Sequence, residues 1–383
     1  MTDLDAFAAE KLKSLEAKHL KRTLAETARG DDGIWLTRGA RRLLSFSCND
    51  YLNLSQHPRV KEAAVAAIRD HGAGAGAARL VTGNHPLYAA LESRLAALKE
   101  TEAALVFGSG YLANLGILSA LMGKNDLLLV DELSHSCILA GASLSGGKTL
   151  TFRHNDIAHA EELLRTHRAH YRNALIATDG VFSMDGDLAP LKELAALGHA
   201  HDAWLLSDDA HGIGVVGGGR GSAIATGAKV DLQMGTLSKA VGGYGGYLCA
   251  SKPVIDLMTN RARTFVYSTA LPPAVAAGAT AALDIIATDA ALVAAPLAKA
   301  RTFTTHLNLH PAQSAIVPIL LGDAEAALKA QRLLEDEGFL VAAIRPPTVP
   351  PGTARLRFTF TAAHPDAEIV RLADLVKTRI LKR

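Results

Sequence analysis

Short apolar runs alternating with longer helical patterns are the feature that most constrains how this chain folds. Six runs with the length and residue types of buried strands occur between residues 103 and 251, and helical stretches over 156–169 and 187–201 separate several of them. Neighbouring parallel strands need a crossover connection, which is usually a helix. The alternation therefore predicts an α/β fold with a mostly parallel sheet covered by helices. The runs are AALVF, DLLLVD, ALIATDGVF, AWLLSDDAH, VDLQMGTL and GGYLCAS.

The pattern outside these runs divides the chain into three parts. Leucines near helical spacing predict an amphipathic helix over 4–27, followed by a short β element. Pro272-Pro273 precedes an Ala-rich helical segment over 273–300, and short strand patterns then flank a helix near 323–337. We therefore predict an N-terminal helix and short β segment over 1–44, a large domain over 45–285, and a smaller C-terminal α/β domain over 286–383.

Composition excludes several classes of protein. The 40 basic and 38 acidic side chains leave a net charge of +2, whereas nucleic-acid binders carry a concentrated basic excess. The three cysteines, Cys48, Cys137 and Cys249, lie far apart, which excludes a disulfide framework and a CxxC zinc site and fits a reducing cytoplasm. We therefore expect no nucleic-acid partner and no metal.

Neither a secretory signal nor a membrane span is expected. The N-terminus carries acidic residues early and lacks an apolar segment. Two stretches, Ala103–Gly123 and Thr264–Leu283, contain no charge, but the first reads as a strand, a turn and a helix, and Pro272-Pro273 interrupts the second. We expect a cytoplasmic protein.

One glycine motif resembles a dinucleotide-binding fingerprint. Gly212, Gly214 and Gly217 match GxGxxG after a strand-like run. A Rossmann turn must open into a helix at its third glycine, and here the chain continues as Gly-Gly-Gly-Arg-Gly-Ser, which is typical of a loop. The sequence therefore disfavours a nicotinamide cofactor.

Three other features together point to pyridoxal phosphate (PLP). Asp208 stands at the predicted end of a strand, where open parallel sheets bind ligands. Lys239 follows another strand and precedes a run of glycines, and its amine could form a Schiff base. Gly108 to Tyr111 form a turn before a predicted helix, where backbone N–H groups bind phosphate. Each alone also fits an ordinary surface turn, but PLP requires all three: a carboxylate for the ring nitrogen, an amine for the aldehyde, and a phosphate site.

The chain resembles the α-oxoamine synthases, a family of fold-type I PLP enzymes. The resemblance runs through nearly the whole length, in order, and it implies a large domain with a seven-stranded-type sheet and a smaller C-terminal domain. The matching segments are NDYLNLSQHP (49–58), ARLVTGNHPLYAALE (78–92), SGYLANLG (109–116), DELSHSCIL (131–139), DGVFSMDGD (179–187), DDAHG (208–212), TLSK (236–239), YSTALPP (267–273) and IRPPTVPPGTARLRFT (344–359).

This resemblance implies a role for each matching residue. Lys239 would bond to the cofactor and later carry a proton, and Asp208 would pair with the ring nitrogen. His135 would stack on the ring, while Ser183 and His211 would bond to its phenolic oxygen. The phosphate would be held by Ser109, Gly110, Tyr111 and Thr236, and by Thr269 of a neighbouring subunit in a homodimer. On the substrate side, Arg357 or Arg345 would bind the amino-acid carboxylate, Thr348 would lie near the acyl group, and Arg22 would receive a distal carboxylate.

Within the family, NDYL and RPPTVPPGTARLR are most similar to members that join L-alanine to a pimeloyl thioester, on coenzyme A or on a carrier protein. Asn53 and Ser238 replace residues that are commonly glycine in the family. The nearest alternatives use glycine with an acetyl or succinyl thioester. An aminotransferase, which would need a 2-oxo-acid acceptor, and a non-catalytic binding protein are more distant alternatives.

Overall fold

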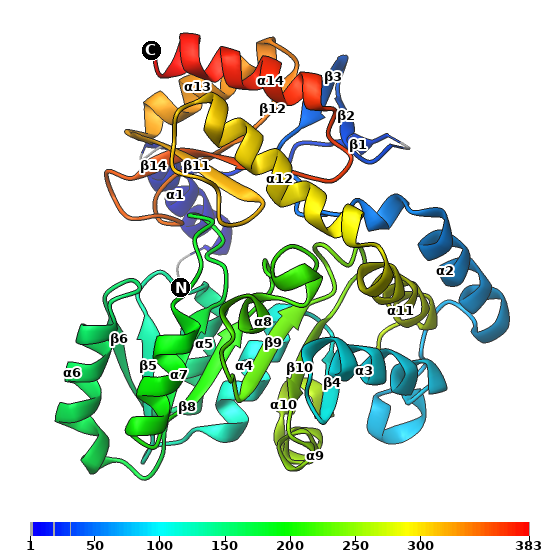
Figure 1. Ribbon diagram of the computed structural model, residues 1–383, viewed down its shortest axis with the longest axis vertical. Coiled ribbons are helices and arrows are strands. Elements are labelled where there is room, and N and C mark those ends of the chain that lie inside the picture. The colour runs from blue at the N-terminus through cyan, green and yellow to red at the C-terminus, as the bar shows by residue number, and fades with distance from the viewer. Residues whose placement is uncertain (1–2, 18–19, 31, 383) are drawn as a thin grey trace. The chain divides into compact units, whose positions relative to one another are not determined.

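The mostly parallel sheet predicted from the sequence is present (Figure 1). The structure, a computed structural model, describes residues 3–17, 20–30 and 32–382. Seven strands form the sheet, and β10 alone among them runs antiparallel to its neighbours. In spatial order they are β4 (Ala103–Phe107), β10 (Gly246–Ala250), β9 (Leu232–Thr236), β8 (Trp204–Asp208), β7 (Ala174–Asp179), β5 (Leu127–Asp131) and β6 (Lys148–Phe152). All six predicted runs contain strands of this sheet, and β6 is the strand that the sequence reading missed.

Helices cover both faces of this sheet, because alternate residues of each strand are apolar on both sides. One face packs against α4 (Gly110–Leu121), α5 (Ser136–Ser145), α9 (Lys252–Arg261) and α10 (Arg263–Val266). The other packs against α6 (Ile157–His167), α7 (Leu191–Ala200) and α8 (Ser222–Thr226) along one half. Along its other half it packs against α2 (Pro58–His71), α3 (Pro86–Lys99) and α11 (Pro273–Thr288).

Local sequence signals set where many of these helices begin. Proline occupies the first turn of α2, α3 and α11, where its missing N–H is not needed. Carboxylates cap other helices by accepting a backbone N–H. They are Asp156 for α6, Asp289 for α12 (Ala290–His306) and Asp323 for α13 (Ala324–Asp336).

The division of the chain differs from the predicted domains. One compact unit contains 47–318 with 358–383, and the other contains 1–46 with 319–357. The small domain is therefore not the continuous segment 286–383. The N-terminal β2 (Trp35–Arg38) and β3 (Arg41–Ser45) share a sheet with β12 (Phe339–Leu340), which pairs with β3 in parallel, so distant parts of the chain fold together.

The C-terminal segment 358–383 belongs to the larger unit because it packs against α12. Phe303 of α12 contacts Phe358 and Phe360, at ring-centroid distances of 4.9 and 5.2 Å. Helix α14 (Asp366–Leu375) lies against α12, where Lys299 bonds to Asp366 at 2.8 Å. The remaining strands are β1 (Ala28–Arg29), β11 (Ile316–Gly322), β13 (Ala342–Ile344) and β14 (Ala354–Thr359).

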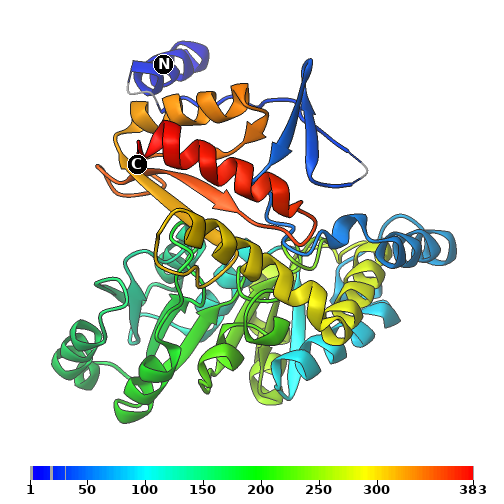
Figure 2. The same cartoon turned by 45° about the horizontal axis from the view of Figure 1, so that its top comes forward.

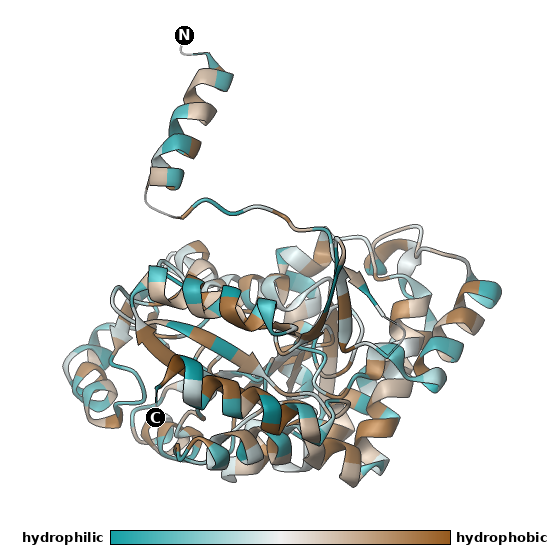
Figure 3. Ribbon diagram, turned by 90° about the horizontal axis from the view of Figure 1, so that it is seen from above, coloured by the Kyte–Doolittle hydropathy of each residue, from teal (hydrophilic) through white to brown (hydrophobic). Residues whose placement is uncertain are grey.

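The predicted N-terminal helix is shorter than the leucine spacing indicates. Helix α1 spans Leu4–Ala17, residues 20–27 carry no regular structure, and residues 18 and 19 lie outside the described part. Polar and apolar residues are mixed along α1, and every residue of it is exposed (Figure 3). The leucine pattern thus continues beyond the point at which the helix ends.

The Ala-rich segment over 273–300 forms two helices rather than one. Helices α11 and α12 meet at Asp289 with a bend of 80° (Figure 2). Within the described residues, no single helix is long and apolar enough to cross a membrane. The bent pair α11 and α12, taken together, meets this criterion by length and composition alone.

Candidate active site

A pocket of about 240 Å³ lies at the carboxyl edge of the parallel strands of the large sheet. Its lining residues are Ser109, Gly110, Tyr111, His135, Cys137, Asp179, Asp208, Ala210, His211, Met234, Thr236, Ser238 and Lys239. Each parallel strand except the edge strand β6 delivers at least one of them at or just beyond its end, from β4, β5, β7, β8 and β9. Residues from five separate segments therefore meet because parallel strands finish at one edge, the usual ligand site of such sheets.

The turn after β4 can hold an anion. Ser109 caps α4, where its hydroxyl accepts a hydrogen bond from the Leu112 N–H at 3.1 Å. A Cβ added at Gly110 would lie 3.4 Å from the Thr236 Cβ, and one at Gly246 would lie 2.5 Å from the Ser109 carbonyl carbon. The chain passes so close here that glycine is required at Gly246. The amino end of α4 therefore faces the pocket with its N–H groups at the place predicted for a phosphate.

Two buried carboxylates stand side by side in the pocket. The Asp208 Oδ2 accepts from the Asn114 amide at 2.7 Å, and its Oδ1 accepts from the Ala210 N–H at 3.0 Å. Asp179 accepts from the His135 N–H at 3.0 Å. Burial, and then the negative charge of Asp208, raise the pKa of Asp179 well above its usual range. The raised pKa favours the protonated form of Asp179, whereas Asp208 accepts hydrogen bonds from two donors.

Hydrogen bonds hold both predicted histidines, His135 and His211, in place. His135 caps α5, and its Nδ1 lies 2.8 Å from the Cys137 Sγ and 3.3 Å from the Cys137 backbone nitrogen. Burial lowers the pKa of His135, against the opposing effect of Asp208, so the neutral ring is favoured. His211 Nδ1 lies 2.6 Å from the Tyr51 hydroxyl, and both side chains are buried.

Lys239 enters the pocket from the segment after β9. The Thr236 hydroxyl donates to the Gly245 carbonyl at 2.8 Å and lies 2.7 Å from the Ser238 hydroxyl, so the turn that carries the lysine is tied down on both sides. A lysine amine, a carboxylate and a helix N-terminus therefore share one cavity. These are the groups that PLP requires.

Not every predicted residue lies in this pocket. Ser183 follows β7 and Thr269 forms an isolated bridge with Ala78, but neither is among the described residues that line the cavity. Thr269 instead lines a smaller cleft with Arg79. The four predicted substrate residues belong to the other unit: Arg22, Arg345, Thr348 and Arg357. Within that unit Arg22 donates to the Thr348 hydroxyl at 3.2 Å, which brings two of these residues together.

The sequence reading missed five residues of this neighbourhood: Tyr51, Asn114, Cys137, Asp179 and Ser238. All five stand inside the motifs that carried the resemblance. A polar residue in an otherwise apolar stretch, such as Asn114 in LANLGIL, was the signal that could have identified them.

The glycines after Asp208 make room for a buried ion pair. The GxGxxG segment forms a short 3₁₀ turn at Gly217–Gly219, and no α-helix begins at its third glycine, as the sequence predicted. A Cβ at Gly212 or Gly221 would lie within 2 Å of the Asp209 carboxylate. These glycines therefore make room for the buried pair of Asp209 and Lys99, and they do not line the pocket.

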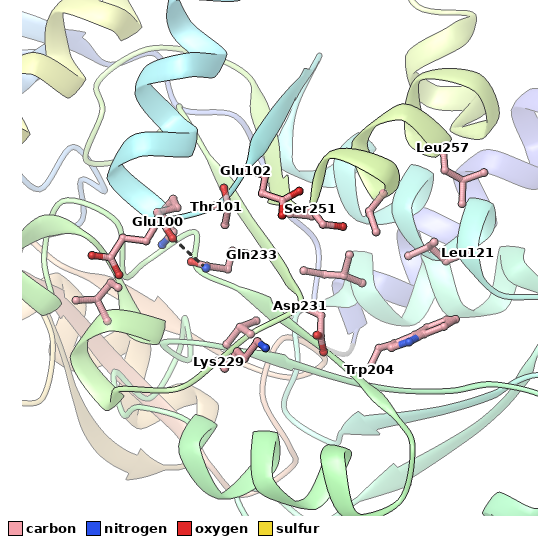
Figure 4. Close-up of a pocket in the computed structure, with 16 residues that line it drawn as sticks. Glu100, Thr101, Glu102, Leu121, Trp204, Lys229, Asp231, Gln233, Ser251 and Leu257 are labelled. Atoms are coloured by element: carbon pink, nitrogen blue, oxygen red, sulfur yellow. Dashed lines mark hydrogen bonds between the residues drawn. The ribbon is translucent and has the colours of Figure 1, made fainter.

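A larger cavity, of about 640 Å³, lies at the opposite edge of the same sheet. Leu121, Leu257 and Trp204 gather on one side of it, and Glu100 and Lys229 on the other (Figure 4). It contains none of the predicted site residues. In the described part of the chain, no group of three or more His, Cys, Asp or Glu side chains could hold a metal ion.

Comparison with known proteins identifies the family. The model of the aminotransferase class I and II family matches residues 41–376. The chain belongs to this family. Two of its relatives, from Beijerinckia indica subsp. indica and Methylocella silvestris, are named 8-amino-7-oxononanoate synthase. The first is 63% identical over 98% of both chains, and the second is 65% identical over 89% of this chain and 98% of its own.

A solved member of the same fold is serine palmitoyltransferase from S. paucimobilis, with a bound PLP–myriocin aldimine. It is 29% identical, covers 98% of both chains and superposes with a TM-score of 0.91. The fold-type I architecture expected from the motifs is therefore confirmed, and the named relatives confirm the resemblance to the α-oxoamine synthases.

Proposed function

We propose that this chain is a PLP-dependent 8-amino-7-oxononanoate synthase of biotin biosynthesis. It would condense L-alanine with a pimeloyl thioester, on coenzyme A or a carrier protein, and release CO₂ and the free thiol. The observation that carries the proposal is the convergence of Lys239, Asp208 and His135 in one pocket at the carboxyl edge of the sheet. The relatives at 63% and 65% identity, which bear that name, support the choice of substrates.

The residues of the pocket have distinct roles in this chemistry. PLP, when bound, supplies an electron sink for the negative charge that develops at the Cα of the amino acid. Asp208 would hold the ring nitrogen protonated, since the Asn114 amide and the Ala210 N–H keep its carboxylate in place. The Nζ of Lys239 would hold the cofactor before alanine enters, and then accept the Cα proton. The amino end of α4 and the Thr236 hydroxyl would bind the phosphate.

His135 would lie against the face of the ring. Because burial favours its neutral form, it would present a flat imidazole without adding a second cation beside the lysine. His211, fixed by Tyr51, would donate to the phenolic oxygen together with Ser183. Arg357 or Arg345 would bind the amino-acid carboxylate and Arg22 the distal carboxylate, with Thr348 beside the acyl chain.

The active form would be a homodimer with its site at the subunit interface. Thr269 and Ala78 form a bridge that joins two segments, and exposed apolar side chains stand on both: Leu80, Val81 and Tyr267 are 54%, 74% and 74% exposed. An exposed apolar patch of this kind is typical of a protein interface. In the dimer, Thr269 of one subunit would reach the phosphate site of its partner. Because its three cysteines form no disulfide in the described part of the chain, we expect the enzyme to work in the reducing cytoplasm.

One experiment tests the reaction. The purified protein, loaded with PLP, should show a visible absorption band and release CO₂ and free thiol with L-alanine and pimeloyl-CoA. Parallel assays with glycine or serine, and with acetyl-, succinyl- or palmitoyl-CoA, separate the related acyl transferases. A 2-oxo acid as sole acceptor tests transamination. Turnover confined to one of the other pairs would contradict the proposal.

Lys239→Ala provides the residue-level test. It should abolish the visible band that depends on the lysine, and with it turnover. Lys252→Ala is a matched control, because this lysine is exposed on α9 and bonds to Asp256 of the same helix. Full activity of Lys239→Ala would refute the assignment of the lysine.

A further inference from the structure

Asn114 is a fully buried amide that no sequence argument assigned. It lies on α4 one turn after Gly110, among the apolar residues Ala113, Ile117 and Leu118. Burying an amide among apolar side chains is unfavourable unless it is hydrogen-bonded. Its Nδ2 makes two contacts, to the Asp208 Oδ2 at 2.7 Å and to the Cys137 Sγ at 3.0 Å. Its Oδ1 has no partner among the described residues.

The two contacts fix which way the amide faces. The Asp208 carboxylate is an acceptor, so the amide must turn its N–H₂ group toward it, since an oxygen there would repel the carboxylate. The second amide hydrogen then points to the Cys137 sulfur. Cys137 can in turn donate its S–H to the His135 Nδ1, 2.8 Å away. Burial raises the pKa of this thiol to about 12, in keeping with a thiol that holds its proton.

The Asp208 carboxylate is held by two different elements as a result. Its Oδ1 accepts from Ala210 in its own turn, and its Oδ2 accepts from Asn114 on α4. A hydrogen bond to an ionised acceptor is among the stronger kinds in proteins. If the Asn114 bond were lost, the carboxylate could rotate about its side-chain bond. Among the described residues, the charged and titratable groups that interact with Asp208 or with its neighbours in the pocket are Asp179, His135, Cys137, Lys239 and Tyr247.

We propose that Asn114 is a positioning residue for the proposed reaction, whose amide holds the Asp208 carboxylate aimed at the cofactor's ring nitrogen. This rests on the proposed function in so far as it requires PLP in this pocket. The same helix then serves the cofactor twice. Its amino end faces the phosphate site, and Asn114, one turn later, supports the group that acts on the far end of the ring.

The test compares Asn114→Leu and Asn114→Ala with the wild-type holoenzyme. Both substitutions remove the amide donor. Asn114→Leu nearly keeps the side-chain volume, and Asn114→Ala leaves a small cavity. If one variant does not fold, the other still tests the proposal. Ser119→Ala is the control, because Ser119 lies on α4 and its hydroxyl bonds only to the backbone of its own helix. Circular dichroism and the thermal midpoint report whether each variant is folded.

Three readouts follow the role of the amide. Without the Asn114 donor, the Asp208 carboxylate competes with the cofactor's ring nitrogen for the proton. The pH midpoint of the visible absorption band should therefore move upward by about one unit. The dissociation constant of PLP should rise, and kcat should fall at least tenfold, with the KM for the thioester unchanged. Ser119→Ala should move none of these.

The possible results separate this proposal from the proposed function. If the wild type binds PLP but does not condense alanine with pimeloyl-CoA, the proposed function fails, while the band midpoint and the PLP affinity still test Asn114. If the wild type binds no PLP, both fail. If a folded variant keeps the wild-type band midpoint, PLP affinity and kcat, the positioning role of Asn114 is refuted.

Discussion

The buried ion pair of Lys99 and Asp209 offers the sharpest test of how the catalytic turn is held in place. The Lys99 and Asp209 side chains are 0% and 2% exposed, and their charged ends are in direct contact. Lys99 also donates to the Arg220 carbonyl at 2.8 Å, and Asp209 accepts from the Ser222 N–H at 3.0 Å. Lys99→Met removes one charge and leaves the other buried with a single donor.

The expected cost is large because an unpaired buried charge cannot regain its hydration. Removing one partner of a buried ion pair costs about 3–5 kcal/mol. The larger unit contains close to 300 residues, for which the unfolding entropy is roughly 0.6 kcal/mol/K. The thermal midpoint of this unit should therefore fall by roughly 5–8 °C. Lys252→Met, an exposed lysine that bonds to Asp256, should cost less than about 0.5 kcal/mol.

The assay can read the larger unit alone. The chain has two tryptophans, and they lie in different units, Trp35 in one and Trp204 in the other. In a Trp35→Phe background, urea unfolding followed by tryptophan fluorescence reports the unit that carries the ion pair. The double variant Lys99→Met/Asp209→Asn should be more stable than Lys99→Met, since both charges are gone. If the two substitutions simply add, or if Lys99→Met costs less than about 1 kcal/mol, the ion pair does not hold this turn.

Three further predictions follow from other parts of the structure. Burial alone would lower the pKa of His154, but hydrogen bonds to Asp131 and Asp187 raise it to about 10. Its contribution to stability should be complete below the unfolded pKa of 6.5 and disappear as pH rises through 10, so the difference in urea stability between wild type and His154→Gln should shrink over that range. Gly246→Ala, whose Cβ would collide with the Ser109 backbone, should weaken PLP binding at least tenfold in equilibrium dialysis. Arg22→Gln should raise the KM for the pimeloyl donor about tenfold and leave the KM for L-alanine unchanged in steady-state assays, and equal changes in both would contradict its role.

The clustering of the candidate site residues follows from the sequence more directly than the division of the chain into units does. Residues such as Asp208 and Lys239 each follow an apolar run, and the carboxyl ends of parallel strands meet at one edge. Once the strands are recognised, the approach of Asp208 and Lys239 in space follows from local information. Strand β12 contributes only two residues to its pairing with β3, and almost 300 positions separate the two strands in the sequence. Nothing in the sequence of either strand indicates that it pairs with the other. Long-range pairing of this kind depends on the whole fold, which is why the compact units differ from the predicted continuous segment 286–383.

Buried polar contacts were hidden for a different reason. At the sequence level Lys99 is an ordinary basic residue in the last turn of a helix, where it is expected to be solvated. Its burial depends on where α3 lies against the sheet. The same holds for α1, whose leucine spacing predicts a packed face although none of its residues is buried. Periodicity reports which face of a helix could be buried, and only the surrounding fold decides whether it is.

The adjacent carboxylates Asp208 and Asp209 show how the fold gives identical side chains opposite roles. Successive residues at a strand end point to opposite faces of the sheet. Asp208 turns to the face covered by α4, where it meets a neutral amide and keeps one side open to the pocket. Asp209 turns to the face covered by α3, where it pairs with the buried Lys99. Its carboxylate fills the space beside Gly212 and Gly221, where a Cβ would collide with it. The first carboxylate therefore remains available to a positively charged ligand atom, while the second fixes the turn on which the first stands.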